Sequence, residues 1–265
     1  MIPLKDNIEA ERTPFVRNVL IALTAAVFLL QLAAGPEDAS IVEGYGMIPA
    51  RVLDPDVEIR IPTSVYLPGT SIARTGYRLA AEGAVPAWLT ILTCIFLHGG
   101  WMHFLGNMWF LWIFGDNVED RFGHLGFAAF YLGTGALASL SHLGLYPDSV
   151  IPTIGASGAI AGVMGAYFVL YPRARVLTLV PIFFFLEFFV LPAPLFLGVW
   201  FALQFFQGAA SLGTDAAGVA WWAHIGGFVA GALLGLLARG QTPQRRSVEI
   251  LRRDGTRFGR RPPRW

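Results

Sequence analysis

The strongest constraint on this chain is a series of six apolar segments, each long enough or nearly long enough to cross a lipid bilayer. A bilayer core is spanned by about 20 mostly apolar helical residues. The segments are Asn18–Ala34, Trp101–Gly115, Leu125–Leu145, Ile154–Tyr171, Leu191–Gln207 and Ala217–Leu237. Only 14% of the 265 residues are charged, which is too little to cover a water-soluble globule. The sequence therefore predicts an all-α polytopic membrane protein.

The charge distribution argues against a seventh crossing at the further apolar stretch Val176–Val190. The C-terminal tail carries eight arginines and two acidic residues, and basic segments beside membrane helices tend to stay in the cytoplasm. Six crossings place this tail, the N-terminus and the linker with Arg173 and Arg175 on the cytoplasmic side. The long loop between the first two segments is then outside, and it has seven acids and four arginines. We therefore interpret Val176–Val190 as an interfacial segment or a bent lead-in to the fifth helix.

This topology divides the chain into three regions. They are a cytoplasmic N-terminal segment at 1–17, a six-helix membrane domain at 18–239 with its long outer loop at 35–90, and a basic cytoplasmic tail at 240–265. A cleaved signal peptide is a weaker alternative for the first segment, because its apolar run of 17 residues is longer than a typical signal core. The net charge of +1 gives no indication of nucleic-acid binding. Cys94 is the single cysteine, so neither an intramolecular disulfide nor a thiolate metal cluster is expected.

Polar residues occur near the beginning of the second, fourth and sixth apolar segments. In a six-span topology these three helices enter from the outer side, so their first turns lie at a similar depth. The second segment begins with His103 and Asn107, just after His98; the fourth has Ser157 and the sixth has His224. Ionisable residues within membrane segments are costly and often mark function.

Helical spacing predicts how these residues meet. His103 and Asn107 are four apart, so they share one helix face. Ser157 and His224 each head a stripe of small residues, and such stripes let membrane helices approach closely. The stripes are Ser157, Ala161 and Gly165 on the fourth helix, and His224, Gly227, Gly231 and Gly235 on the sixth. We therefore expect these helices to pack together with Ser157 within reach of His224.

This set of side chains is typical of acyl transfer. A serine becomes a nucleophile when a neighbouring base takes its proton, and neutral histidine suits that role. The side chains of His103 and Asn107 and the amide of Ser157 can donate hydrogen bonds to an oxyanion. The turn at Gly155 precedes the fourth helix and leaves backbone amides unpaired. No Asp or Glu lies at this depth on the fourth or sixth helix, which favours a Ser–His dyad.

Less specific interpretations stay open for each residue alone. A single serine in a membrane helix usually packs or donates a hydrogen bond, and a single histidine is often structural. A metal site is weakly indicated, because His98 and His103 are five apart and no Cys, Asp or Glu is near. The soluble nucleophile elbow G-x-S-x-G does not fit, because Ala159 takes its last position. The joint occurrence on three helices is what favours catalysis.

Three motifs together resemble the rhomboid family of intramembrane serine proteases, of the bacterial six-helix type. They are "HGGWMHFLGNMWFLWIFGDNVEDRFG", "GASGAIAG" and "AHIGGFVAGALLG", in this order, and the resemblance extends from about Phe15 to Leu237. It implies a six-transmembrane-helix bundle and a cofactor-free, metal-free endopeptidase that cleaves single-pass transmembrane proteins in the lipid bilayer. It also implies a multi-pass protein of the bacterial inner membrane. The implied roles are Ser157 as nucleophile, His224 as base, His103 and Asn107 as oxyanion donors, and His98 and Gly155 as accessory residues.

The resemblance carries two further expectations and two departures. Glu119 and Arg121 match a polar pair that we interpret as structural, and 208–218 matches a mobile cap over the site. Many rhomboids have a Trp-Arg pair in the first loop, which this chain lacks. Many also have an aromatic residue one turn after the serine that stacks on the histidine; here Ala161 stands there. The orientation of His224 must then come from elsewhere, for which Trp221 and Trp222 are candidates.

Two other functions remain as alternatives. A non-catalytic rhomboid-like scaffold that binds membrane clients typically lacks the serine or the histidine, and this chain has both. A transporter or channel is expected to have charged or repeated elements near the midplane, and the sequence shows neither.

Overall fold

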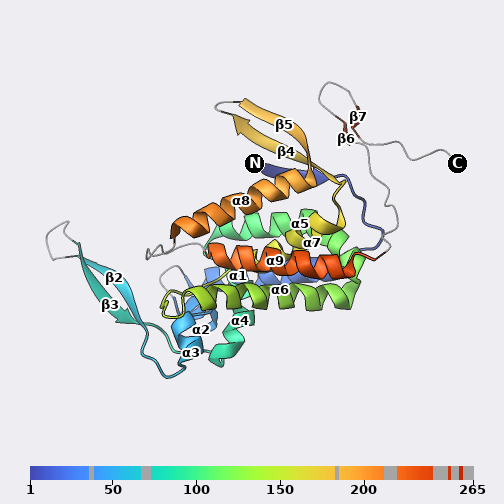
Figure 1. Cartoon of the computed structure of the whole chain (residues 1–265). Coiled ribbons are helices and arrows are strands. Elements are labelled where there is room, and N and C mark those ends of the chain that lie inside the picture. Colours follow the sequence, from blue (N-terminus) through green and yellow to red (C-terminus); the bar gives the residue numbers. More distant parts are fainter. Residues whose placement is uncertain are drawn as a thin grey trace.

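The described residues include six long helices, which lie roughly side by side and form the body of the molecule (Figure 1). The structure is a computed structural model that describes residues 1–35, 39–66, 73–182, 185–211, 220–240, 250–251 and 257–258. The long helices are α1 (Phe15–Ala34), α5 (Trp101–Phe122), α6 (His124–Leu145), α7 (Ser157–Leu170), α8 (Ala193–Ser211) and α9 (Trp221–Ala238).

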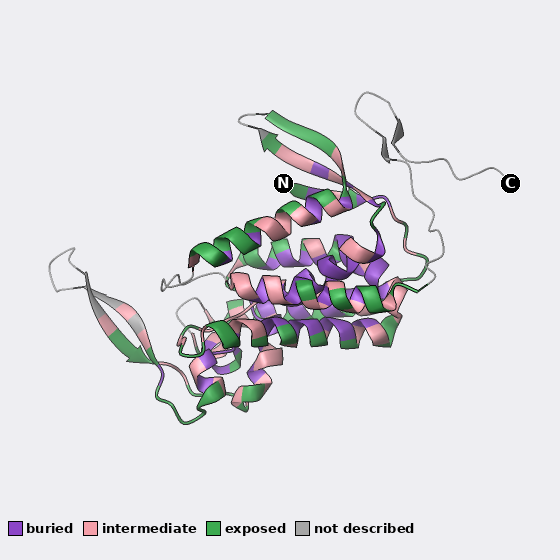
Figure 2. Ribbon diagram, in the orientation of Figure 1, coloured by how far each residue is buried: buried purple, intermediate pink, exposed green. Residues whose placement is uncertain are grey.

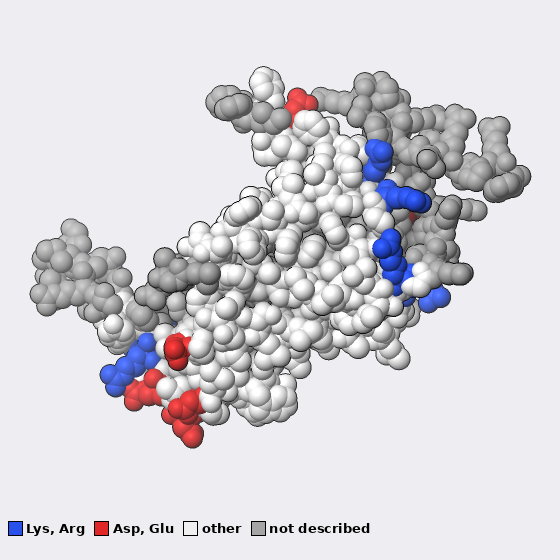
Figure 3. Space-filling view, viewed as in Figure 1, with Lys and Arg blue, Asp and Glu red and all other residues white. Residues whose placement is uncertain are grey.

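Length and hydropathy identify three of these helices, α1, α8 and α9, as able to cross a membrane. A fourth crossing is counted when Ala87–Phe96 and α5 are joined as one span bent by 80°. The helix α7 is apolar but shorter, with 14 residues. Figure 3 shows a broad neutral surface between a mostly basic end and a mostly acidic end of the molecule. The chain is a multi-pass integral membrane protein.

The helix α7 occupies the centre of the bundle. Eleven of its residues are buried, and it packs most extensively against α9 (Figure 2). The glycine stripe of α9 makes this approach possible. A Cβ atom on Gly231 would overlap the carbonyl oxygen of Gly162, and one on Gly227 would overlap that of Gly158. The predicted packing of the fourth helix against the sixth is therefore confirmed.

The structure contains strands that an all-α prediction omits. An antiparallel sheet has the order β1-β4-β5, and β2 pairs with β3 and β6 with β7. Their bounds are β1 (Ile2–Asp6), β2 (Arg60–Tyr66), β3 (Ala73–Leu79), β4 (Arg175–Ile182), β5 (Phe185–Pro192), β6 (Ile250–Leu251) and β7 (Arg257–Phe258). The fold is mostly helical, but it is not all-α.

The segment Val176–Val190 forms strands. It makes up most of the β4–β5 hairpin, and β5 ends at Pro192, directly before α8 begins, so the segment leads into the fifth helix as a strand. The interfacial interpretation stays a prediction. Valine, leucine, isoleucine and phenylalanine dominate the hairpin, and β-branched and aromatic residues favour strands. An apolar run of this length does not by itself distinguish a strand from a helix.

Element boundaries also differ from the prediction. The second helix, α5, extends to Phe122 instead of Gly115, through the charged run that follows. Within the N-terminal segment 1–17, β1 pairs with β4, and α1 begins at Phe15, three residues before the predicted Asn18. Most of the basic tail lies outside the described residues.

The pair Glu119 and Arg121 ties helix ends together, as expected of structural residues. The two carboxylate oxygens of Glu119 accept the backbone N–H groups of Val16 and Arg17 at 2.8 and 2.7 Å. These amides belong to the first turn of α1 and have no partner within the helix. The guanidinium of Arg121 donates to the carbonyl oxygen of Ala238, at the end of α9.

The outer loop is organised by one arginine although the Trp-Arg pair is missing. It contains α2 (Ser40–Tyr45), α3 (Pro49–Leu53) and the 3-10 turn η1 (Ala87–Leu89). The short helix α4 (Thr90–Thr93) and a second 3-10 turn, η2 (Cys94–Phe96), follow it before α5. The buried Arg51 donates to the carbonyl oxygens of Glu43 and Ala81, both at 2.7 Å. The carboxylate of Glu43 pairs with Arg78. Arg51 therefore supplies the anchoring of this loop.

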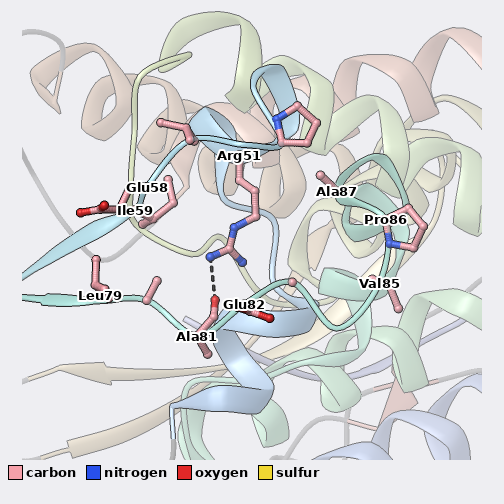
Figure 4. Close-up of a pocket in the computed structure, with 13 residues that line it drawn as sticks. Arg51, Glu58, Ile59, Leu79, Ala81, Glu82, Val85, Pro86 and Ala87 are labelled. Carbon is pink, nitrogen blue, oxygen red and sulfur yellow. Dashed lines mark hydrogen bonds between the residues drawn. The ribbon is translucent and has the colours of Figure 1, made fainter.

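A pocket of about 430 Å³ lies beside Arg51 at the base of the β2–β3 hairpin (Figure 4). Glu58, Leu79, Val85 and Pro86 are among its lining residues. None of the residues that the sequence predicts for catalysis lines it. The loop is also joined to the segment before Ser157, because Met47 and Thr153 exchange two backbone hydrogen bonds.

We expect the protein to become less stable as the pH rises from about 4 to about 7, because of Asp6. Burial raises the pKa of this carboxyl from 3.8 to about 7, although a hydrogen bond from Tyr167 acts in the opposite sense. Between these two pKa values the folded state keeps a proton on Asp6 that the unfolded chain has lost. The contribution of Asp6 to stability is therefore complete at pH values below the unfolded pKa, and it is lost as the pH rises to the folded pKa. Each pH unit in this window should lower the free energy of unfolding by at most about 1.4 kcal/mol.

The measurement is thermal unfolding in mild detergent at about pH 5 and about pH 8, for the wild type and Asp6→Asn. The asparagine keeps an acceptor for Tyr167 and Asn117 but cannot ionise. The difference between the two proteins isolates residue 6 from other titrating groups. If both proteins show the same pH dependence, Asp6 is not the group responsible.

Candidate active site

Ser157 is the first residue of α7, at the end of the bundle that carries the loop between α1 and α5. The turn before it depends on Gly155, whose φ of +125° is rarely adopted by residues with a side chain. The backbone N–H of Gly155 donates to the carbonyl oxygen of Cys94 at 2.9 Å. This turn ends the preceding loop and starts the helix at the serine, three residues later than the predicted start at Ile154.

The side chain of His224 lies directly against the serine. Its Nε2 is 2.7 Å from the Oγ of Ser157. His224 lies in the first turn of α9, where it is 9% exposed, and the close approach of α7 and α9 brings the two residues together. The structure thus places the predicted nucleophile and base within hydrogen-bond distance.

The second nitrogen of His224 has a partner that the sequence analysis missed. Its Nδ1 is 2.7 Å from the Oε1 of Gln204, a buried side chain on α8. A carbonyl oxygen can only accept, so Nδ1 carries the proton and donates it to Gln204. The Nε2 of His224 is then unprotonated and accepts the hydroxyl hydrogen of Ser157. This is the tautomer that a general base requires.

Two tryptophan rings surround the imidazole. The ring of Trp200 lies 5.9 Å from that of His224 at an interplanar angle of 38°. Trp221 meets it edge-on at 6.1 Å and 87°. The expectation that Trp221 helps to orient His224 agrees with this contact, whereas Trp200 was not foreseen. Together with Gln204, these rings restrict the imidazole from three sides.

His103 lies beside the turn that precedes the serine. A Cβ atom on Gly155 would come within 2.7 Å of His103 Nε2 and 3.6 Å of Ser157 Oγ. The absence of a side chain at Gly155 therefore lets His103 approach the nucleophile. The Nδ1 of His103 accepts the backbone N–H of Gly99 at 3.3 Å, which leaves Nε2 directed at the turn as a donor.

Asn107 is one turn further along α5 and is held by His98. The Nδ2 of Asn107 is 2.9 Å from the Nε2 of His98. His98 is fixed in turn by Gln31 of α1, whose side chain exchanges hydrogen bonds with its backbone N–H and carbonyl groups. The accessory residue His98 therefore positions Asn107, and α1 positions His98.

Other predictions for the site concern the cap and metal binding. Of the predicted cap at 208–218, residues 212–218 lie outside the described residues, and residues 208–211 belong to the last turn of α8. Within the described part of the chain, no group of three His, Cys, Asp or Glu side chains could hold a metal ion. The arrangement offers a hydroxyl, a base with a fixed tautomer, and nearby N–H groups.

Comparison with known proteins identifies the family of this chain. Residues 86–241, more than half of the chain, match the family model of the Rhomboid domain. The chain belongs to the rhomboid family. The matched region of this rhomboid includes Ser157, His224, Gln204, His103 and Asn107.

Relatives of this rhomboid occur in several kinds of organism. It is 32% identical to "Rhomboid protein 1, mitochondrial" of Saccharomyces cerevisiae over 171 residues, and this matched region covers 60% of this chain and 44% of the yeast protein. It is 32% identical over 93 residues to "Putative rhomboid protease YdcA" of Bacillus subtilis, covering 35% of this chain and 45% of that protein. Over 88 residues it is 39% identical to "Rhomboid protease GluP" of the same species, covering 33% of this chain and 16% of GluP. The chain thus spans less than half the length of these relatives.

Proposed function

We propose that this rhomboid is a serine endopeptidase that cleaves transmembrane proteins in or near their membrane-spanning helix. The observation that carries the proposal is the continuous hydrogen-bond chain from Ser157 through His224 to Gln204, with 2.7 Å at each step. The chain gives the histidine the tautomer that accepts the serine proton. A purely structural serine would not require this alignment.

The reaction begins when His224 Nε2 takes the proton of Ser157 and the Oγ attacks the scissile carbonyl carbon. The carbonyl oxygen becomes an oxyanion, for which the Ser157 amide and the side chains of His103 and Asn107 are the candidate donors. The resulting imidazolium remains bonded to Gln204 through Nδ1. His224 then gives its proton to the leaving amine, and the C–N bond breaks to leave an acyl-serine. A water molecule, deprotonated by His224, hydrolyses this ester and restores Ser157.

The substrate class follows from the geometry of membrane helices. A hydrogen-bonded helix hides its carbonyl groups, so the segment to be cut has to unwind locally. We propose single-pass transmembrane proteins with small, helix-weakening residues at the cut. The lipid bilayer holds both enzyme and substrate, and the proposed chemistry uses neither a metal nor a cofactor.

We further propose a six-span topology with both termini in the cytoplasm of a bacterial cell. The basic residues around the inner helix ends support the orientation. The choice of a bacterial inner membrane rests on the resemblance of the motifs, since the relatives include mitochondrial, chloroplastic and Bacillus proteins.

The proposal is tested by reconstituting the full chain in liposomes with single-span reporters that contain a helix-weakening segment. We expect cleavage within or beside the reporter's membrane segment, mapped by mass spectrometry. A fluorophosphonate probe should also label Ser157. If the chain cuts none of a panel of such reporters and the probe does not react, the protease proposal fails. Stable capture of intact reporters would then favour a rhomboid-like scaffold.

We expect Gln204→Leu to lower kcat about tenfold, which is the loss of roughly one hydrogen bond in the transition state. The KM should change little, because Gln204 contacts the histidine and not the substrate. Gln204→Glu restores an acceptor oxygen and should recover part of the activity. Gln207→Leu, on the exposed face of the same helix, is the matched control. An equal loss in both leucine variants would assign Gln204 a merely structural role.

A further inference from the structure

In the β1-β4-β5 sheet, β1 and β4 have one side toward the bundle and one side away from it, whereas β5 is exposed on both sides over most of its length. Pairing register places Ile2, Leu179 and Phe188 in one row across the three strands. Leu177 and Leu186 lie on the same side, which we call the exposed face of the sheet. The opposite side faces the bundle at β4, where Val176 and Thr178 are fully buried, but its β5 residues Phe185 and Phe189 are 68% and 41% exposed.

The exposed face is strongly apolar. Leu186 is 59% exposed, Phe188 is 50% and Ile2 is 46%. The pairing register places two charged residues on this side, Lys5 near the end of β1 and Arg175 at the start of β4. Soluble surfaces rarely expose a contiguous apolar patch of this kind without a partner.

The sheet lies beside the bundle and does not extend beyond its end. The Nε1 of Trp109 on α5 donates to the carbonyl oxygen of Pro3 at 2.6 Å. Trp109 lies about 20 Å from the C-terminal end of α5 at the normal helical rise, so β1 runs back along the helix. Figure 1 agrees, because the β4–β5 hairpin leaves the bundle sideways next to α8.

Charged residues on α5 locate the membrane boundary relative to the sheet. Asp116, Glu119, Asp120 and Arg121 follow an apolar stretch of α5, so the boundary lies close to Asp116. Trp109 is about 10 Å further into the membrane, and Pro3 lies at its level. Arg173 and Arg175 lie at the base of the hairpin, where they can meet lipid headgroups. This level along a membrane-spanning bundle is the level of a lipid leaflet.

The open edge of β5 limits how deep the sheet can lie. Its outward backbone groups have no neighbouring strand in the described chain, and such edges are not tolerated in the hydrocarbon core. Amphipathic elements that lie in the interface bury their apolar side by about 5–10 Å, which matches the level of Trp109. The interface also contains water and headgroups that can pair with the edge.

From these contacts we infer that the β1-β4-β5 sheet is an interfacial membrane element, with its exposed face against the acyl chains of the leaflet on the N-terminal side. The β4–β5 hairpin then anchors the beginning of α8, the helix that carries Gln204. This inference concerns lipid binding and is independent of the proposed proteolysis.

The test uses the full chain in liposomes with a nitroxide attached to a single introduced cysteine at Leu186 or Phe188. Cys94 is buried and stays in place, and unmodified protein reports its background labelling. Leu203 on the lipid side of α8 and Glu58 in the outer loop are the matched lipid and water controls. Oxygen concentrates in lipid, whereas a nickel chelate stays in water. At 186 and 188 we expect oxygen to relax the nitroxide several-fold more than the nickel chelate does. The lipid control at 203 should show the same ratio, and the water control at 58 should show the opposite ratio.

Three results would overturn the inference. If the nickel chelate relaxes the nitroxides at 186 and 188 as strongly as the one at 58, the exposed face of the sheet lies in water. Dipolar coupling between copies would assign it to a dimer interface. If neither oxygen nor the nickel chelate relaxes these nitroxides and no dipolar coupling between copies is seen, another part of the same chain covers the exposed face. If a cysteine variant does not fold, a benzophenone amino acid at Phe188 replaces it: a lipid adduct supports the inference and a protein adduct contradicts it.

Discussion

Ser157→Ala and His224→Ala should each abolish cleavage of a single-span reporter, lowering kcat by about 10⁴-fold or more. The alanine at 157 removes the atom that forms the acyl intermediate. The alanine at 224 removes the base, and water cannot replace a histidine held 2.7 Å from both the serine and Gln204. The double variant should be no worse than either single variant, because the two residues act as one unit.

The measurement is reporter cleavage in liposomes together with covalent labelling by a fluorophosphonate. Ser141→Ala is the matched control, since this serine lies on α6 and its hydroxyl donates to the carbonyl oxygen of Leu137. The control should cleave like the wild type, and all variants should unfold at similar temperatures. Cleavage that persists in Ser157→Ala would refute the mechanism, and labelling that persists in it would place the nucleophile elsewhere.

Helical spacing could predict the contact between Ser157 on α7 and His224 on α9. Glycine and alanine stripes predicted a close approach, and the structure has the carbonyl oxygen of Gly162 against Gly231. Once the two helices are in contact, the positions of Ser157 and His224 in the first turns follow. Sequence spacing suffices here because small residues leave few ways to pack the two helices.

Gln204 does not follow from the sequence as a third residue, because that role is usually an acid's and Gln204 is a neutral amide on the fifth segment instead of the fourth or sixth. The signal was present: an amide in the apolar run "WFALQFF", within the fifth apolar segment. A polar side chain inside a membrane segment has to find a partner. Its partner could not be predicted, because the contact depends on how α8 is rotated against α9.

The β1-β4-β5 sheet could not be read from hydropathy. Val176–Val190 is as apolar as a membrane helix, and periodicity alone does not separate a strand from a buried helix in such a run. The deciding contact is the pairing of β4 with β1, more than 160 residues earlier in the chain. Non-local pairing of this kind leaves no pattern in a local window.

Gly231→Ala should destabilise the protein by about 3 kcal/mol or more, although alanine is the better helix former. A Cβ atom at this position would overlap the carbonyl oxygen of Gly162 and lie 2.6 Å from its Cα. Backbone atoms cannot rotate away as a flexible side chain can. The helices α7 and α9 would therefore have to separate, and Ser157 would move away from His224. Stability and cleavage should fall together.

Gly133→Ala on α6 is the matched control, because nothing lies within 4 Å of a Cβ atom built there. This substitution should leave the unfolding temperature unchanged or raise it, since glycine in a helix is less favourable than alanine by about 0.5–1 kcal/mol. Both variants add the same methyl group to a membrane helix, so the difference between them measures the interhelical contact alone. Equal unfolding temperatures for the two variants would mean that α7 and α9 do not pack backbone against backbone, and the support for the Ser157–His224 geometry would be lost with that contact.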